Sequence, residues 1–269
     1  MNQMIEHRGC PLAYDVRGTG PRVLFIQGVG VHGGGWRPQI DGLADRYTCL
    51  SFDNRGMGRS QPAGADISVA QMADDALAVM DASGWASAHV VGHSLGGQVA
   101  VALALAVRDR VRSLSLLCTF ANGRAVAPLT ARMIWFGMRS QVGTRRMRRR
   151  GFLKLVLPPG PQRENADAMA ERIGELFGHD LADQPPVVKQ QLRAMRACDL
   201  TPRLPELAGL PTLVVSAVHD PIAPPRVGRG LLGIPGSRYV EFPDASHGLP
   251  ITHAEQVNVL LHEQFAAAP

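Results

Sequence analysis

The chain has 269 residues, of which 45% are hydrophobic and 19% charged, an ordinary composition for a globular protein with a substantial core. No apolar run reaches the roughly 18 residues of a membrane span, and charged residues break the first apolar stretches, so we expect a cytoplasmic protein with neither a signal peptide nor a stable membrane association. The net charge of +5 is concentrated in residues 121–200, with 14 Lys and Arg against 7 Asp and Glu, and no nucleic-acid module accompanies it, so no nucleic-acid partner is expected.

The first predicted elements are short strands. Residues 3–6 and 12–16 predict two antiparallel strands around a turn at 9–11. Residues 23–26 form a continuous apolar run, which is typical of a buried parallel strand. A glycine-rich loop, residues 27–36, follows this third strand.

The glycine-rich loop also carries a formal dinucleotide-binding fingerprint, Gly28-x-Gly30-x-x-Gly33, with Asp53 20 residues further on. In nucleotide-binding folds the third glycine opens the helix that holds the pyrophosphate. Here two more glycines follow it, and glycine disfavours helix, so we expect the helix to begin near Trp36. An NAD(P)-binding oxidoreductase is one alternative function that this pattern leaves open.

The next stretch alternates strand and helix. Residues 47–52 predict the fourth strand, and a tight turn with two glycines follows at 53–60. We expect this turn to be structural, held by a charge-assisted contact between aspartate and arginine. Apolar residues near helical spacing predict a helix over 68–83, and residues 89–92 predict the fifth strand.

The fifth strand leads into Gly92-x-Ser94-x-Gly96, and an alanine-rich helical run follows at 98–107. Strand, tight turn and helix are the setting of a nucleophile elbow, in which glycines permit a strained turn and the serine hydroxyl stands clear of the sheet. Because a lone serine hydroxyl is a poor nucleophile, the chain must also supply a base and a group that orients it.

The remaining strands are predicted at 111–117, 212–217 and 238–242. Asp220 follows the seventh strand and His247 follows the eighth, so both meet Ser94 at the carboxyl edge of a parallel sheet. Between the sixth and seventh strands the alternation stops, and residues 121–200 predict several helices broken by proline and glycine. Further helices are predicted at 226–232 and 253–266.

With these residues the chain resembles the α/β-hydrolase fold family, most closely small-molecule carboxylesterases and 3-oxoadipate enol-lactonase-like hydrolases. The resemblance implies an α/β fold with a mostly parallel central sheet flanked by helices and a helical cap inserted after the sixth strand. Residues 1–120 and 201–269 would form the core and residues 121–200 the cap. It also implies Ser94 as nucleophile, Asp220 as acid and His247 as base.

The resemblance further implies an oxyanion hole made by the backbone N–H groups of Val29 and Leu95. Gln27 stands where the family commonly has histidine, which leaves open how the loop that carries Val29 is held. His32 is interpreted as a loop histidine and His93 as local support of the elbow.

Other residues compete for the catalytic roles. Asp244 is the nearest rival for the acid, and His219 and His253 are weaker candidates for the base. The arginine-rich run at 145–150 predicts a solvated cap surface, with attraction of an anionic substrate or surface as the alternative. Cap residues are expected to line an apolar substrate pocket: Trp135, Phe136, Met138 and Leu153.

The function that these patterns favour is serine-catalysed hydrolysis of a carboxylic ester or lactone of a small, partly apolar substrate. Carbon–carbon hydrolysis of a diketone on the same triad is the alternative within the fold. A receptor-like ligand-binding protein is the alternative outside catalysis. The four cysteines are far apart and lack zinc-site spacing, so we expect neither a metal nor a cofactor.

Overall fold

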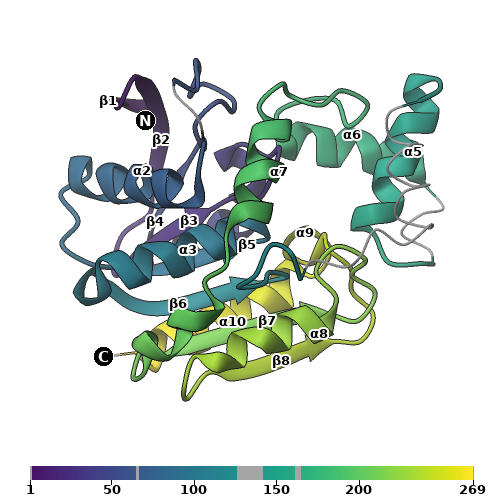
Figure 1. Ribbon diagram of the computed structural model, residues 1–269. Coiled ribbons are helices and arrows are strands. Elements are labelled where there is room, and N and C mark those ends of the chain that lie inside the picture. The colour runs from purple at the N-terminus through teal and green to yellow at the C-terminus, as the bar shows by residue number, and fades with distance from the viewer. Residues whose placement is uncertain (1, 65–66, 126–141, 161–164, 269) are drawn as a thin grey trace.

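The computed structural model describes residues 2–64, 67–125, 142–160 and 165–268 (Figure 1). Eight strands form one sheet. The strands are β1 (Asn2–His7), β2 (Cys10–Arg17), β3 (Arg22–Ile26), β4 (Thr48–Phe52), β5 (Ala88–His93), β6 (Val111–Leu117), β7 (Thr212–Ala217) and β8 (Arg238–Phe242).

The sheet is mostly parallel, as expected. Its strand order is β1-β2-β4-β3-β5-β6-β7-β8. The hairpin β1–β2 and the β2–β4 pair are antiparallel, and every later pair is parallel. Strand β5, which leads into Ser94, therefore lies near the middle of the sheet, between β3 and β6.

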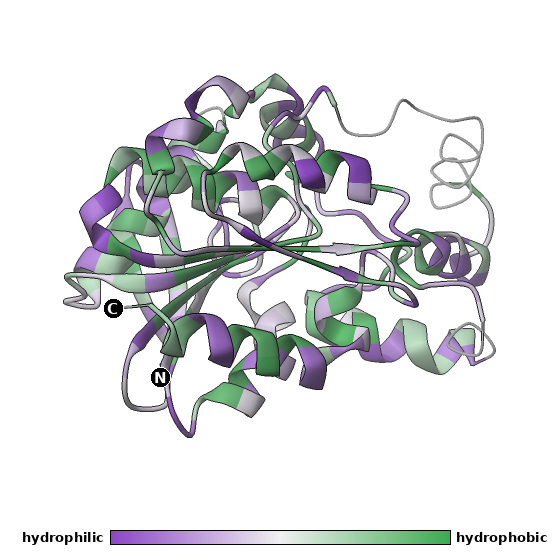
Figure 2. Ribbon diagram, turned by 90° about the horizontal axis from the view of Figure 1, so that it is seen from below, coloured by the Kyte–Doolittle hydropathy of each residue, from purple (hydrophilic) through white to green (hydrophobic). Residues whose placement is uncertain are grey.

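Helices cover both faces of this sheet, which Figure 2 shows nearly edge-on. The α-helices among the described residues are α1 (Arg37–Leu43), α2 (Val69–Ala82), α3 (Leu95–Ala106), α5 (Arg145–Val156), α6 (Ala166–Phe177), α7 (Val188–Ala197), α8 (Pro225–Gly228), α9 (Leu249–Thr252) and α10 (Ala254–Ala266). The shorter 3-10 helices are η1 (Gly33–Trp36), η2 (Arg108–Arg110), η4 (Thr201–Leu207) and η5 (Arg229–Gly233). No described helix is both long and apolar enough to cross a membrane.

Alternate residues of the central strands enter different cores. Leu24 and Ile26 of β3 pack with α2 and α3, whereas Val23 and Phe25 pack with α1, α9 and α10 on the other face. Successive side chains of a strand point to opposite faces, so a parallel strand covered on both sides must be apolar throughout. This is why the buried strands are continuous apolar runs in the sequence.

Among the described residues, the α-helices between β6 and β7 are α5, α6 and α7, which are drawn in teal and green in Figure 1. The two ends of the 121–200 segment meet, because Asn122 and Asp199 form an isolated antiparallel bridge. Helices α5 and α6 bury a small apolar core of their own. We propose on these grounds that residues 121–200 are the cap and that 1–120 and 201–269 are the core.

The arginine-rich run at 145–150 begins helix α5 and is paired with aspartates of the same segment. Arg145 and Arg149 contact Asp180, at 2.7 and 2.5 Å. Arg146 contacts Asp167 at 2.7 Å, and Arg150 contacts it at 3.3 Å. These pairs lower the local positive field, which favours the solvated, structural interpretation over an anion-attracting patch.

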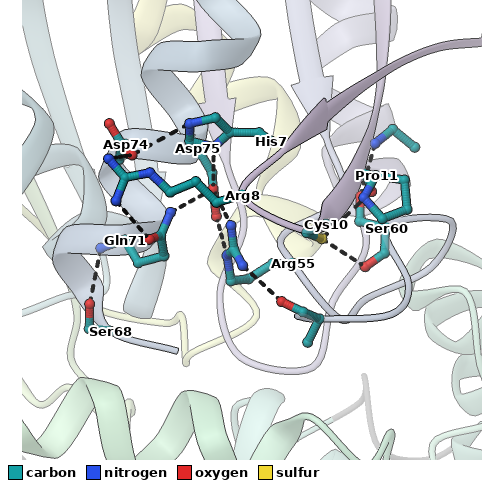
Figure 3. Close-up of polar contacts among 12 residues, drawn as sticks. His7, Arg8, Cys10, Pro11, Arg55, Ser60, Ser68, Gln71, Asp74 and Asp75 are labelled. Carbon is teal, nitrogen blue, oxygen red and sulfur yellow. Dashed lines mark hydrogen bonds and ion pairs between the residues drawn. The ribbon is translucent and has the colours of Figure 1, made fainter. Parts of the chain in front are cut away.

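The turn at 53–60 is anchored by a buried ion pair with a partner that the sequence did not indicate. Arg55 donates from Nε and Nη2 to Asp75 of α2, both at 2.6 Å, and both side chains are buried (Figure 3). Asp75 also contacts His7 Nδ1 at 2.9 Å and accepts from Gln71 Nε2 at 3.1 Å. The carboxylate thus joins β1, α2 and the loop after β4.

Replacing Asp75 by asparagine removes the charge that balances the buried Arg55 guanidinium. Breaking a buried pair from one side is strongly destabilising, so we expect Asp75→Asn to lower the free energy of unfolding by about 3 kcal/mol. Asp81→Asn is the matched control, because Asp81 lies on the same helix and pairs with Arg110 at the surface. It should cost less than about 1 kcal/mol. Urea unfolding of the three proteins measures both values, and equal losses would contradict this account of the buried pair.

Candidate active site

The turn between β5 and α3 has the geometry of a nucleophile elbow. Ser94 has φ 55° and ψ −123°, a strained conformation for a residue with a side chain. A Cβ on Gly92 would collide with the carbonyl of Gly96, and a Cβ on Gly96 would collide with the carbonyl of Ile26. The two motif glycines are therefore required because backbone passes directly over both of their Cα atoms.

The end of β6 supports this turn. The Ser94 N–H donates to Leu117 O at 3.1 Å, and the Thr119 hydroxyl donates to Ser94 O at 2.5 Å. A neighbour, Cys118, has φ 46° and its thiol contacts Asp220. Burial raises the pKa of this thiol, and the Asp220 carboxylate raises it further, so Cys118 is a neutral donor to the carboxylate.

Asp220 and His247 form a buried pair beside Ser94. His247 Nδ1 lies 2.7 Å from Asp220 Oδ2, and the second carboxylate oxygen accepts from the N–H groups of Ile222 and Ala223 at 2.8 and 2.9 Å. A carboxylate fixed in this way holds the imidazole in the tautomer whose Nε2 is free to accept a proton. Among the described residues the Ser94 hydroxyl has no hydrogen-bond partner, and such serine–histidine contacts commonly tighten only when substrate binds.

The rival residues are engaged elsewhere. Asp244 is exposed and lies 3.4 Å from His253, so these two contact each other rather than the Ser94 turn. His219 is exposed at the surface. The structure thus pairs His247 with Asp220 and His253 with Asp244.

His93 supports the loop that carries His247. Its Nε2 lies 2.9 Å from the His247 carbonyl oxygen, which can only accept, so this nitrogen carries the proton. Burial, together with a smaller effect of the neighbouring His247, lowers the pKa of His93 to about 3. His93 is therefore a neutral donor, which agrees with its interpretation as local support.

The glycine-rich loop leaves one amide open next to Ser94. Gln27 folds its side-chain oxygen back onto the Gly28 N–H at 3.2 Å, and Gly30 N–H donates to Gln191 Oε1 at 2.9 Å. Among the described residues neither Val29 N–H nor Leu95 N–H meets an acceptor. Gly28 lies so close to the elbow that a Cβ would approach Ser94 Cβ to 3.1 Å. This geometry is compatible with Val29 and Leu95 as oxyanion donors.

Asp53 has a structural role in the same loop. Its two carboxylate oxygens accept from Gly33 N–H at 2.8 Å and from Arg59 N–H at 2.9 Å. Gly33 opens only the short η1, and the α-helix begins at Arg37. Asp53 is thus occupied by main-chain donors, and the loop lacks the helix N-terminus that a dinucleotide needs at its third glycine.

A cavity of about 210 Å³ opens onto Ser94 and His247. Its walls come from the glycine-rich loop, from the cap and from the loop after β8. The apolar side chains contributed by the cap are Phe152, Leu155, Val156, Phe177, Val188, Leu192 and Met195. Among the described lining residues there is no Lys, Arg, Asp or Glu, so this part of the cavity suits an uncharged, partly apolar ligand.

Of the four pocket residues predicted from the sequence, the structure describes only Leu153. Trp135, Phe136 and Met138 lie outside the described residues. Leu153 differs from the prediction, because it is buried between α5 and α6 and does not line the cavity. On a helix, residue 153 points about 100° away from residue 152, so the face that presents Phe152 to the cavity turns Leu153 into the cap's own core.

Sequence reasoning missed four residues that support the site: Cys118, Thr119, His179 and Gln191. The last two lie in the cap, where the resemblance is weakest and no local motif marks them. Among the described residues no three His, Cys, Asp or Glu side chains gather as a metal site.

The chain is similar to known proteins over most of its length. A sequence model of the alpha/beta hydrolase fold matches residues 21–254. The candidate carbamate hydrolase RutD of Azorhizobium caulinodans is 33% identical over 258 residues, which cover 93% of each chain.

Two solved structures are similar over nearly the whole chain. The enol-lactonase of Burkholderia xenovorans has a TM-score of 0.82 and 25% identity, covering 98% of this chain and 100% of its own. A thermophilic esterase of Thermogutta terrifontis has a TM-score of 0.79 and 27% identity, covering 99% and 98%.

The buried histidines predict how stability changes with pH. Burial lowers the pKa of His93 to about 3 and of His89 to about 4, so below pH 6.5 the unfolded chain takes up protons that the folded chain does not. Stability is therefore lost as the pH falls from 6.5 toward 4, by at most about 1.4 kcal/mol per pH unit for each histidine. We expect His93→Gln to show a shallower dependence than the wild type.

The exposed His219 provides the control, since His219→Gln should keep the wild-type slope. The measurement is urea unfolding at several pH values between 4 and 7. Equal slopes for His93→Gln and the wild type would mean that the folded protein protonates His93.

Proposed function

The chain belongs to the alpha/beta hydrolase fold family, and we propose that this hydrolase is a serine hydrolase that cleaves a carboxylic ester or lactone of a small, uncharged, partly apolar substrate. The observation that carries the proposal is the buried Asp220–His247 hydrogen bond of 2.7 Å beside the strained Ser94 turn, at one end of an apolar cavity.

The mechanism follows from these positions. His247 Nε2 takes the proton from Ser94 Oγ as the oxygen attacks the acyl carbon, and Asp220 stabilises the imidazolium that forms. The N–H groups of Val29 and Leu95 hold the oxyanion, a contribution of about 3 kcal/mol per donor. Collapse of the intermediate expels the alcohol oxygen, which takes the proton from His247. Water, deprotonated by His247, then attacks the acyl-enzyme. Ser94 Oγ leaves and takes that proton back from His247, which releases the acid product.

The desolvated setting supports this scheme. Ser94, Asp220 and His247 are all buried, and charge–dipole interactions are stronger in a site that excludes water. Burial keeps the adjacent His93 neutral, so it adds no positive charge next to the base.

Carbamate hydrolysis is the second candidate, and the 33% identity to RutD over 93% of the chain favours it. Carbamates and esters pass through the same kind of tetrahedral intermediate, so the triad and the two amide donors serve both. The ester and lactone proposal rests on the similarity to an enol-lactonase and an esterase and on the apolar wall of the cavity. A p-nitrophenyl carbamate assayed beside the matching ester separates the two, because faster turnover of the carbamate favours the second candidate.

Substitutions at the triad test the mechanism directly. We expect Ser94→Ala to lower kcat for p-nitrophenyl butyrate by at least about 10⁴-fold, and Asp220→Asn by about 10⁴-fold, because the asparagine no longer selects the reactive tautomer of His247. The rival carboxylate gives a matched control, and Asp244→Asn should keep the wild-type rate. Steady-state kinetics of the four proteins measure these changes, and activity that survives in Ser94→Ala would refute the assignment of the nucleophile.

The lining of the cavity predicts a preference for neutral acyl groups. A carboxylate that enters a cavity lined by no cation loses its hydration and gains no ionic partner. This loss costs about 3 kcal/mol, which corresponds to about a hundredfold in kcat/KM. We therefore expect p-nitrophenyl butyrate to be hydrolysed about a hundredfold more efficiently than p-nitrophenyl hemisuccinate, which has a similar length and a terminal carboxylate. A preference for the hemisuccinate would contradict the prediction.

A further inference from the structure

The backbone of Gly30, in the loop beside Ser94, is held on both sides by side chains of the cap. Its N–H donates to Gln191 Oε1 at 2.9 Å, and its carbonyl oxygen lies 2.8 Å from His179 Nε2. Gln191 belongs to α7, and His179 follows α6. Both polar groups of a single glycine in the catalytic core are thus satisfied by the inserted segment.

Close packing accompanies these hydrogen bonds. Gly30 has φ 71°, and a Cβ on it would lie 3.1 Å from Val188 Cγ2 on α7. A Cβ on Gly178, at the end of α6, would approach the His32 ring to 2.5 Å. The ends of α6 and α7 therefore rest directly on the glycine-rich loop.

Three successive amides of this loop differ in whether their N–H has an acceptor. Gly28 N–H is taken by the Gln27 side chain and Gly30 N–H by Gln191, whereas Val29 N–H, between them, has no acceptor among the described residues. The direction of an N–H follows the plane of its peptide, and that plane is set by the dihedral angles on either side. The Val29 N–H lies in the Gly28–Val29 peptide, between the Gln27–Gly28 peptide, held by Gln27, and the Val29–Gly30 peptide, held by Gln191. Holding both neighbouring peptides restricts the dihedral angles that set where the Val29 N–H points.

We propose that Gln191 and His179 are positioning residues that orient the Val29 N–H toward the oxyanion, so that the oxyanion hole is complete only when the cap is seated on the loop. The inference rests on the proposed function, because an oxyanion donor has its role only in acyl transfer. It makes the cap a part of the catalytic geometry as well as a wall of the cavity.

The burial of Gln191 distinguishes positioning from substrate contact. Gln191 is fully buried and does not line the cavity, so it touches the loop without touching a ligand. Its Nε2 has no partner among the described residues, which leaves the Oε1 contact to Gly30 as its polar role. Removing the side-chain oxygen therefore tests this one hydrogen bond.

His179 contributes from the other side through its Nε2 atom. Its two ring nitrogens face the carbonyl oxygens of Gly30 and Asp180, at 2.8 and 2.9 Å, and a carbonyl can only accept. The contact with Gly30 requires a proton on Nε2. The Asp180 carboxylate next to it is held by Arg145 and Arg149, so the paired arginines of α5 anchor the segment that carries His179.

The kinetic test compares two neighbouring glutamines of α7. Gln191→Met keeps the length of the side chain and removes the acceptor, whereas Gln190→Met makes the same change at an exposed position. With p-nitrophenyl butyrate we expect Gln191→Met to lower kcat by about tenfold to a hundredfold with little change in KM, because the lost interaction acts in the transition state. Gln190→Met should match the wild type. Gln191→Glu keeps an oxygen acceptor and should recover part of kcat.

Amide hydrogen exchange of residues 27–31 tests the clamp without any substrate. Exchange should be faster in Gln191→Met than in Gln190→Met, and His179→Phe, which cannot donate, should show the same loosening and a lower kcat. Unchanged exchange in both variants would overturn the clamp. So would a KM effect without a kcat effect in Gln191→Met, because Gln191 does not line the cavity and such an effect would indicate a substrate contact.

A loosened loop with wild-type kcat would overturn the positioning role alone. A wild-type protein that hydrolyses none of the esters or carbamates would overturn the proposed function, and the positioning role with it. Failure of the proposed function is seen in the wild type, whereas failure of the positioning role alone is seen only in the variants, so the two outcomes can be told apart.

Discussion

The constraint on which this structure depends is the left-handed backbone at Ser94. A residue with a side chain holds φ 55° only when its surroundings leave no other conformation. Here the surroundings are the β3 carbonyl above Gly96 and two groups that bond the Ser94 backbone, Leu117 O at the end of β6 and the Thr119 hydroxyl just after it. The strained residue directly follows a central strand of the sheet, β5, which lies between β3 and β6. A central strand of a sheet covered on both faces can bear that cost, whereas an edge strand has fewer neighbours to oppose it.

Burial gives the groups around this turn their chemical character. Asp220 has a hydrogen-bond partner for each oxygen, so its charge is compensated even though the side chain is out of water. His93 and Cys118 are kept neutral by the same burial and act as donors, one to the His247 backbone and one to Asp220. Asp220 and His247 are thus the carboxylate and the imidazole that form the pair beside Ser94.

The cap reaches both loops that meet at Ser94. Val156 O, at the end of α5, accepts from Gly248 N–H at 2.7 Å, directly after His247. Gln191 and His179 hold Gly30 in the opposite loop. The ion pairs of the arginine-rich run lie within the cap and tie α5 to α6 and to the segment after it. The arginine-rich run, which the sequence predicted to be a solvated surface, thus also holds the helices of the cap together.

The sequence by itself determined the fold and the identity of the catalytic candidates. Continuous apolar strands, the glycines around Ser94, and Asp220 and His247 each just after a strand are local patterns, and a parallel sheet gathers strand ends at one edge. The tertiary structure decided the partners: Asp75 for Arg55, Asp167 and Asp180 for the arginine-rich run, Gln191 and His179 for Gly30. It also turned Leu153 away from the cavity. These contacts join residues far apart in the chain through the packing of an inserted helical segment, and no local pattern encodes which face of a helix will meet which loop.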